Sequence, residues 1–271
     1  MDRIKTMVRK VMTTIFIMAS FFTMINAADY SVQKYIPKNF SKYKDTLYTS
    51  VTKTMADEFK IDDGYDDIFF VSYFGGLIEH ENCISLRYNS CWNPKTQFKT
   101  KWKSGLNREQ GAGLAMITRA WRSNGQLRFD NVNNLRKKYP KYLGELTWDN
   151  ITDRPDLQIM AAALLYKSNY IRLSTRIPIL DRVAMADSAY NGGLGYVIKD
   201  RKVCGLKANC DPDLWFDNVE TINNRGTKKL YGNRSAQEIN RNHVRDVIFN
   251  RFGKYYEFYI SEKIDMSLPG L

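Results

Sequence analysis

Apolar side chains recur at helical spacing through most of this 271-residue chain. The first such stripe consists of Tyr43, Leu47, Val51, Met55 and Phe59. Polar residues separate its members, which is the pattern of an amphipathic helix. Similar patterns occur in residues 66–83, 155–170, 183–190 and 236–260. Because alternating strand patterns are few and short, we expect a mainly α fold.

The N-terminus has the pattern of a secretory signal peptide. Four basic residues, Arg3, Lys5, Arg9 and Lys10, precede an apolar run over residues 11–25, and Asn26-Ala27-Ala28 follows it. The apolar run is shorter than the ~20 residues that span a bilayer, which favours a signal over a retained anchor. We therefore expect residues 1–27 to be a signal peptide and the protein to be exported to the periplasm or cell envelope.

The four cysteines form two close pairs in the sequence, Cys83 with Cys91 and Cys204 with Cys210. In an oxidising compartment such pairs usually become disulfides, which is the prediction here. A metal site built from His80, Cys83 and Cys91 is an alternative, but it lacks a fourth ligand. We expect no metal and no other cofactor. Free thiols are the remaining alternative.

The net charge of +12 would attract nucleic acid, anionic lipid or an acidic envelope polymer. We interpret Lys and Arg as spread along the chain rather than gathered in one block. The sequence contains no zinc-finger spacing and no RNP-type motif. Nucleic acid is therefore not an expected partner.

The helix predicted over residues 66–83 carries two glutamates near its end. Its buried stripe is predicted to consist of Phe70, Phe74, Leu77 and Ile78. Continuing this stripe leads to Glu81, whereas Glu79 lies about 200° away around the helix. Glu81 is thus expected to face the interior and Glu79 a more polar side.

The remaining segments have weaker patterns. Residues 84–110 are expected to form a long loop, with helix resuming near Gly113-Leu114. The helix over residues 183–190 should stop at Asn191-Gly192-Gly193. A terminal packing helix is expected over residues 236–260, with His243 as a surface or capping residue.

Three stretches together resemble the lytic transglycosylase and goose-type lysozyme superfamily, most closely its phage- and mobile-element-type members. They are GLIEHENC (76–83), REQGAGLAMITRAW (108–121) and SAYNGGLGYVIKDR (188–201). The resemblance implies a mainly α, lysozyme-like fold with a sugar-binding cleft. It divides the chain into a signal peptide (1–27), a lead-in helix (28–65), a transglycosylase-like catalytic domain (66–258) and a C-terminal tail (259–271).

The resemblance also implies roles for individual residues. Glu81 would be the catalytic acid and base. The substrate-binding residues would be Asn82, Gly113, Leu114, Met116, Tyr190 and Asn191. Ser is commoner than Asn at the place of Asn82, and Gln is usual where Met116 stands. Tyr190 would sit over the catalytic carboxyl group and orient it by a hydrogen bond.

The reaction implied is cleavage of the bond between N-acetylmuramic acid and N-acetylglucosamine in peptidoglycan. With one carboxylate, the 2-acetamido group of the sugar could supply the second catalytic group. Burial at the end of an apolar stripe is expected to raise the pKa of Glu81, so that it acts first as an acid. It would then take a proton from the 6-hydroxyl group and yield a 1,6-anhydro end.

Other functions stay open. A positioned water would make the same site a hydrolytic muramidase. A catalytically silent peptidoglycan-binding module is the second alternative, which Met116 in place of Gln favours. A basic DNA-associated protein of a transfer apparatus is the third. The expected binding partner is the glycan strand of peptidoglycan. The sequence does not identify partners in secretion, conjugation or phage assembly.

Overall fold

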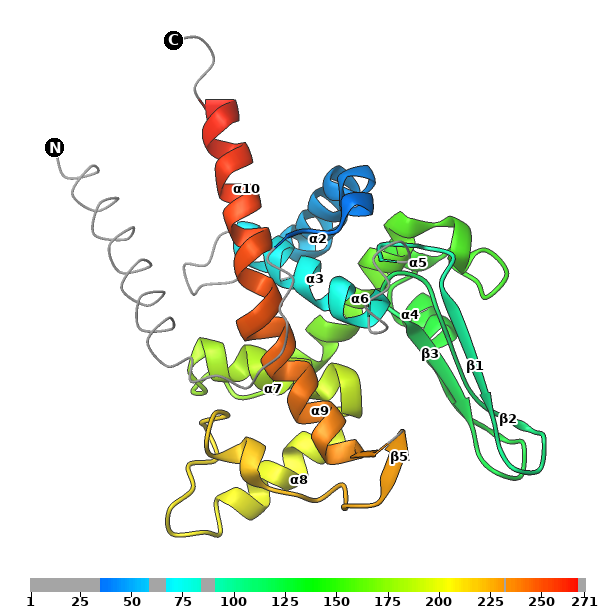
Figure 1. Ribbon diagram of the computed structural model, residues 1–271, viewed down its shortest axis with the longest axis vertical. Coiled ribbons are helices and arrows are strands. Elements are labelled where there is room, and N and C mark those ends of the chain that lie inside the picture. The colour runs from blue at the N-terminus through cyan, green and yellow to red at the C-terminus, as the bar shows by residue number, and fades with distance from the viewer. Residues whose placement is uncertain (1–34, 59–66, 84–90, 232, 268–271) are drawn as a thin grey trace, which may run out of the picture. The chain divides into compact units, whose positions relative to one another are not determined.

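A computed structural model describes residues 35–58, 67–83, 91–231 and 233–267 (Figure 1). The predicted signal peptide lies outside the described residues, as do Phe59 and the side chain of Met55 from the first predicted stripe. Residues from Lys34 onward belong to one compact unit. None of the helices in the described ranges has the length and apolar character needed to cross a membrane.

Helices form most of the structure, so the mainly α expectation is confirmed. The longer ones are α2 (Lys44–Glu58), α3 (Asp67–Asn82), α6 (Pro155–Tyr170), α7 (Ile179–Gly192), α8 (Leu194–Cys204), α9 (Ala236–Arg245) and α10 (Phe252–Ser267). Shorter helices are η1 (Lys38–Lys42), α4 (Asn131–Lys138), α5 (Pro140–Leu143), η2 (Ile151–Asp153) and η3 (Val219–Thr221). The expected end of α7 at the glycines is also confirmed.

Helix α3 lies at the centre of the packing. It contacts α2 and α10, and α2 in turn packs on α6. Phe70, Phe74 and Leu77 are at most 1% exposed, and burial of each such side chain contributes about 1.5–3 kcal/mol. Nearly every residue from Ile68 to Glu79 is buried, on all sides of the helix. A single apolar stripe therefore does not describe this helix.

The segment expected to be loop and then helix forms instead a four-stranded antiparallel sheet. Its strands are β1 (Gln97–Lys101), β2 (Asn107–Ala112), β3 (Ile117–Trp121) and β4 (Leu127–Asp130), in that order across the sheet. The expectation of a loop over 84–110 and a helix from Gly113 is wrong for the described residues. Both faces of these strands carry polar side chains, so the alternation that reveals a half-buried strand is missing.

The C-terminal segment is helical, as expected, with a local change of winding. A π-helical turn, η4 (Asp246–Arg251), joins α9 to α10. Both η4 and α10 pack on α3, while α9 packs on α7. Helix α10 continues to Ser267, into the segment that the resemblance assigns to a tail.

Both predicted disulfides are present. Cys83 is joined to Cys91 and Cys204 to Cys210, with Cα atoms 4.7 and 5.2 Å apart. The first disulfide follows directly on the end of α3. The cysteines required by the alternative metal site are thus engaged with each other.

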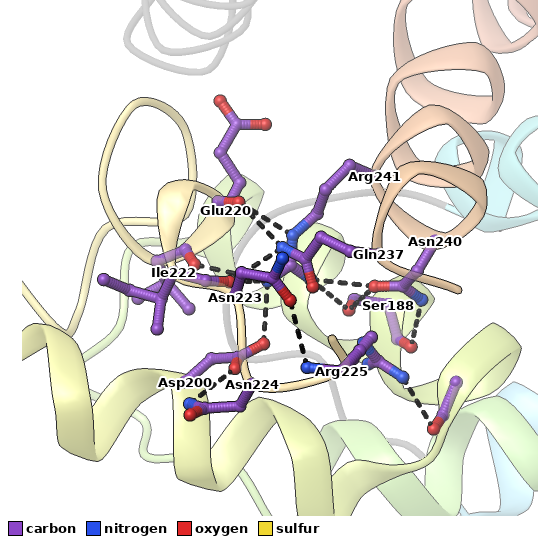
Figure 2. Close-up of polar contacts among 12 residues, drawn as sticks. Ser188, Asp200, Glu220, Ile222, Asn223, Asn224, Arg225, Gln237, Asn240 and Arg241 are labelled. Atoms are coloured by element: carbon purple, nitrogen blue, oxygen red, sulfur yellow. Dashed lines mark hydrogen bonds and ion pairs between the residues drawn. The ribbon is translucent and has the colours of Figure 1, made fainter. Parts of the chain in front are cut away.

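A buried polar cluster fixes α9 against α7 and α8 (Figure 2). At its centre Arg241 donates to Asp200 Oδ2 at 2.7 Å and to the carbonyl oxygen of Glu220 at 2.8 Å. Asn240 donates to the carbonyl oxygen of Ser188 at 2.9 Å and accepts from the hydroxyl of Ser188 at 2.7 Å. The bonds between Asn240 and Ser188 fix the position of α9 along α7, three residues before His243 and one residue after Asp187.

Candidate active site

The two glutamates of α3 lie in different surroundings. Glu79 is 1% exposed, and its carboxylate accepts hydrogen bonds from Arg251 at 2.6 Å, Lys254 at 2.5 Å and Tyr255 at 2.6 Å. The expectation that Glu81 is the more buried of the two is therefore wrong, although Glu79 does lie among polar side chains. Its charge is neutralised by two cations, and its contacts connect α3 to η4 and α10.

Glu81 lies one half-turn further along α3, and its side chain is 14% exposed. Its Oε1 is 2.9 Å from Nε2 of His243. In the part of the chain that the structure describes, Oε2 has no hydrogen-bond partner. One carboxyl oxygen is thus fixed by the protein, and the other is available to a ligand.

His243 is buried rather than on the surface, which corrects the sequence prediction. Only 1% of it is exposed, and its Nδ1 is 2.7 Å from Oδ2 of Asp187. The other oxygen of Asp187 accepts a hydrogen bond of 2.5 Å from the hydroxyl of Tyr73. A continuous hydrogen-bonded series therefore runs from Glu81 through His243 and Asp187 to Tyr73.

The protonation state of His243 follows from the charges around it. Burial lowers the pKa of His243, but the adjacent carboxylates of Asp187 and Glu81 outweigh burial and raise it to about 10. At neutral pH the imidazolium then donates from both ring nitrogens, one to each carboxyl group. Because the charges of His243 and Asp187 are opposite, Glu81 faces an ion pair rather than a full positive charge.

A second histidine lies beside this series. His80 Nδ1 is 2.6 Å from Oδ2 of Asp246, and the rings of His80 and His243 are 4.3 Å apart between centroids. Burial and the charge of His243 lower the pKa of His80, against the opposing effect of Asp246. The site thus holds two imidazoles in contact, one with a raised pKa and one with a lowered pKa.

Tyr190 does not orient Glu81 in the way expected. Its hydroxyl donates to the carbonyl oxygen of Ala115 at 2.8 Å, so it joins α7 to the turn between β2 and β3. The site nevertheless affects the pKa of Tyr190, which is raised by burial and by the charges of Glu81 and Asp187. Asn191, next along α7, is exposed and accepts a hydrogen bond of 3.0 Å from Asn240.

The expected substrate-binding residues of the β2–β3 turn also make contacts within the protein. Asn82 accepts from the backbone N–H of Asn93 at 2.8 Å and donates to the carbonyl oxygen of Gly113 at 3.4 Å. The backbone N–H of Leu114 donates to Oε1 of Gln158 at 2.7 Å. These bonds attach the turn to the end of α3 and to α6.

The backbone of this turn requires a glycine. Gly113 has φ of +83°, and a Cβ atom there would lie 2.6 Å from the side chain of Gln158. Met116 also has a positive φ, of 48°, and is half-buried. The turn from Gly113 to Met116 is therefore a fixed structure, held beside the residue that follows Glu81.

Sequence reasoning missed His243, Asp187 and Tyr73. A local signal existed for Asp187, since it is an acid within the apolar run VAMADSAY, where a buried charge needs a partner. For His243 no local signal existed, because its partners are 162 and 56 residues away.

Comparison of the chain with models of known protein families gives no match, and no curated protein matches it.

Proposed function

We propose that this protein is a peptidoglycan lytic transglycosylase in which Glu81 is the single acid and base. The observation that supports this most directly is the state of the Glu81 carboxyl group. His243 holds Oε1, while Oε2 has no partner among the described residues and part of the side chain is open to solvent. A general acid needs this combination of fixed orientation and one accessible oxygen.

In the first half of the reaction, the protonated form of Glu81 gives the proton of its Oε2 to the oxygen of the scissile glycosidic bond. The carbonyl oxygen of the sugar's 2-acetamido group attacks C1 as that bond breaks, which removes the need for a second protein carboxylate. The Nε2–H of His243 stabilises the developing carboxylate through Oε1.

In the second half, the Glu81 carboxylate takes the proton of the 6-hydroxyl group. The 6-oxygen then displaces the acetamido oxygen at C1 and forms the 1,6-anhydro ring, so Glu81 ends protonated as it began. His243 keeps both ring protons throughout, since its pKa of about 10 lies well above neutral pH, and Asp187 stays hydrogen-bonded to Nδ1. They are positioning residues in this scheme.

Export to the periplasm or cell envelope belongs to the same proposal. Two disulfides in a chain of this size are typical of proteins that mature in an oxidising compartment. N-terminal sequencing of protein taken from the envelope should give a start near Ala27 or Ala28. An intact Met1 on exported protein would indicate an anchored form instead.

Mass spectrometry of fragments released from purified peptidoglycan tests the activity. We expect muropeptides that are lighter by one water than hydrolytic products, which identifies the anhydro end. Fragments with ordinary reducing ends would show a hydrolytic muramidase. Binding without release of any fragment would show a silent binding module and reject the catalytic proposal.

A further inference from the structure

The positive charge of the chain is concentrated in one lobe, the sheet β1–β4 with α4 and the start of α5, residues 95–141. This lobe contains twelve Lys and Arg but only two Asp and Glu, a net charge of +10 out of the +12 of the whole chain. Lys and Arg are spread along the chain, since 29 of the 41 lie outside this lobe, but the acids that balance them elsewhere are nearly absent from it. All other residues together carry a net charge of +2.

A hollow of about 560 Å³ opens in this lobe, and Glu81 is not among the residues that line it. It is lined by the end of β4 and by α4, and its cationic side chains are Arg128, Arg136 and Lys137. Among the described residues, none of these three forms an ion pair with a carboxylate. The amide of Asn134 is also exposed at the hollow.

One acid, Asp130, also lines the hollow, but its carboxylate is already engaged. It accepts hydrogen bonds from the backbone and side chain of Asn133 and from Trp148 Nε1 at 2.8–3.1 Å. Asp130 is 6% exposed and caps α4. The charge that the hollow presents to a ligand is therefore positive.

The need to prevent unwanted strand pairing at the sheet edges does not explain these three cationic side chains. Lysines on β1, such as Lys99 and Lys101, can prevent unwanted strand pairing, and Arg128 on β4 also lies at a sheet edge. Arg136 and Lys137, however, belong to helix α4, which has no strand edge to protect. Two arginines and a lysine around one hollow instead match phosphate groups, which guanidinium binds in a bidentate manner.

The aromatic residues in and beside the lobe argue against single-stranded nucleic acid. Single strands bind by stacking bases on free aromatic rings. Here Arg119 covers one face of Trp148 at 4.3 Å and of Trp121 at 5.2 Å, and Arg108 covers one face of Trp102 at 5.3 Å. None of these three rings is fully exposed. A polymer whose units do not stack fits this surface better.

We infer that the hollow binds the sugar-phosphate or polyol-phosphate repeat of an anionic polymer attached to the cell wall. The inference rests on the proposed function only in placing the protein at the wall. Such a polymer would hold the enzyme on its substrate through a site separate from Glu81. At an ionic strength of 0.15 M, charges act over about 8 Å, so binding depends on contact with the lobe itself.

Co-sedimentation with cell-wall sacculi tests this. The full mature chain with Glu81→Gln would serve as parent, so that the wall is not cleaved, and the sacculi would carry their phosphodiester-linked polymers. The triple variant Arg128→Gln, Arg136→Gln, Lys137→Gln should bind about ten-fold more weakly than the parent. The single variant Arg128→Gln, at an exposed site, should lose about three-fold.

A matched control removes three exposed lysines from the region around α8, as Lys199→Gln, Lys202→Gln, Lys207→Gln. It makes the same change in net charge and should bind within two-fold of the parent. Sacculi stripped of phosphodiesters with hydrofluoric acid should bind the parent no better than intact sacculi bind the triple variant. Thermal melting should show that all variants are folded.

Three results would overturn the inference. Unchanged binding of the hollow variants would remove the site, and equal losses in the control would show a general charge effect. Competition by duplex DNA at equal phosphate concentration, as strong as by the purified polymer, would show a nucleic-acid interface. Failure of the proposed function is seen separately, as absence of muropeptide release by the protein with Glu81 intact, and it leaves these binding results unchanged.

Discussion

The Nε2 atom of His243 lies 2.9 Å from Oε1 of Glu81, although 162 positions separate the two residues in the sequence. Asp187 holds the opposite side of the same imidazole at 2.7 Å. The orientation of the Glu81 carboxyl group therefore depends on two helices other than its own, α7 and α9.

Glu81→Gln should abolish most of the activity. Glutamine keeps the size of the side chain and an oxygen for His243 but has no proton to give, so the rate of muropeptide release should fall at least ~100-fold. Binding of glycan strands should be largely retained. Near-normal release by correctly folded Glu81→Gln protein would show that another group is the acid.

Glu79→Ala should act on stability instead. The change leaves the charges of Arg251 and Lys254 without their shared partner in a buried place, which typically costs about 3–5 kcal/mol. Glu79→Gln keeps one acceptor and should cost less, about 1–3 kcal/mol. Urea unfolding gives these values. Release of muropeptides per folded molecule should stay near that of the unsubstituted protein, which is the parent in this and the following comparisons. A greater catalytic loss from Glu79→Gln than from Glu81→Gln would reverse the assignment.

Asp187→Asn should introduce a pH dependence near neutrality. The carboxylate of Asp187 is the main contribution that raises the pKa of His243, and burial lowers it. Without that charge the imidazole should lose its proton as the pH rises through the neutral range, and Glu81 should then lose a donor to Oε1. The initial rate of the variant, relative to that of the unsubstituted protein at the same pH, should fall between about pH 6 and pH 8. A variant profile parallel to that of the parent would contradict this.

The stability of the parent should decrease in alkaline solution for the same reason. The pKa of His243 rises on folding from 6.5 to about 10, so its contribution is complete below pH 6.5 and is lost as the pH rises through 10. Thermal melting of the parent and of His243→Gln between pH 6 and pH 10 should give curves that approach each other as the pH rises. A constant difference over this range would show that His243 does not titrate as expected.

Reduction of Cys83–Cys91 should destabilise the end of α3. Closing a loop of this length typically contributes about 2–3 kcal/mol, and the loop begins two residues after Glu81.

Non-reducing peptide mapping should recover both linked pairs from protein taken from its own compartment. Free thiols at all four positions would reject the assignment.

Much of the helical framework follows from the sequence, because an apolar stripe at 3.6-residue spacing is a local property. The end of α3 could be placed for this reason. The end of α7 followed instead from its glycines, and both disulfides from the close pairing of the cysteines. The sheet could not, since β1 and β2 are polar on both faces and are stabilised by neighbouring strands rather than by a buried face. Its strands pair in chain order as hairpins, but no alternation of apolar residues marks them.

The site itself was only partly predictable. Glu81 stands at the end of a recognisable helix, but the choice between Glu81 and Glu79 rested on a single buried stripe. That criterion fails for a helix surrounded on all sides, where Arg251 and Tyr255 of η4 and α10 surround the second carboxylate. His243 and Asp187 become neighbours only when α9 packs on α7.

The long separation between Glu81 and His243 has a consequence for the timing of assembly. Under the proposed export, a chain that crosses the membrane unfolded would deliver its N-terminal part first, so α3 would arrive well before α9. Until the later segment has folded onto α3 and α7, Glu81 has neither the imidazole on Oε1 nor the packing of α10 behind it. The complete site would thus form last, when nearly the whole polypeptide has been exported.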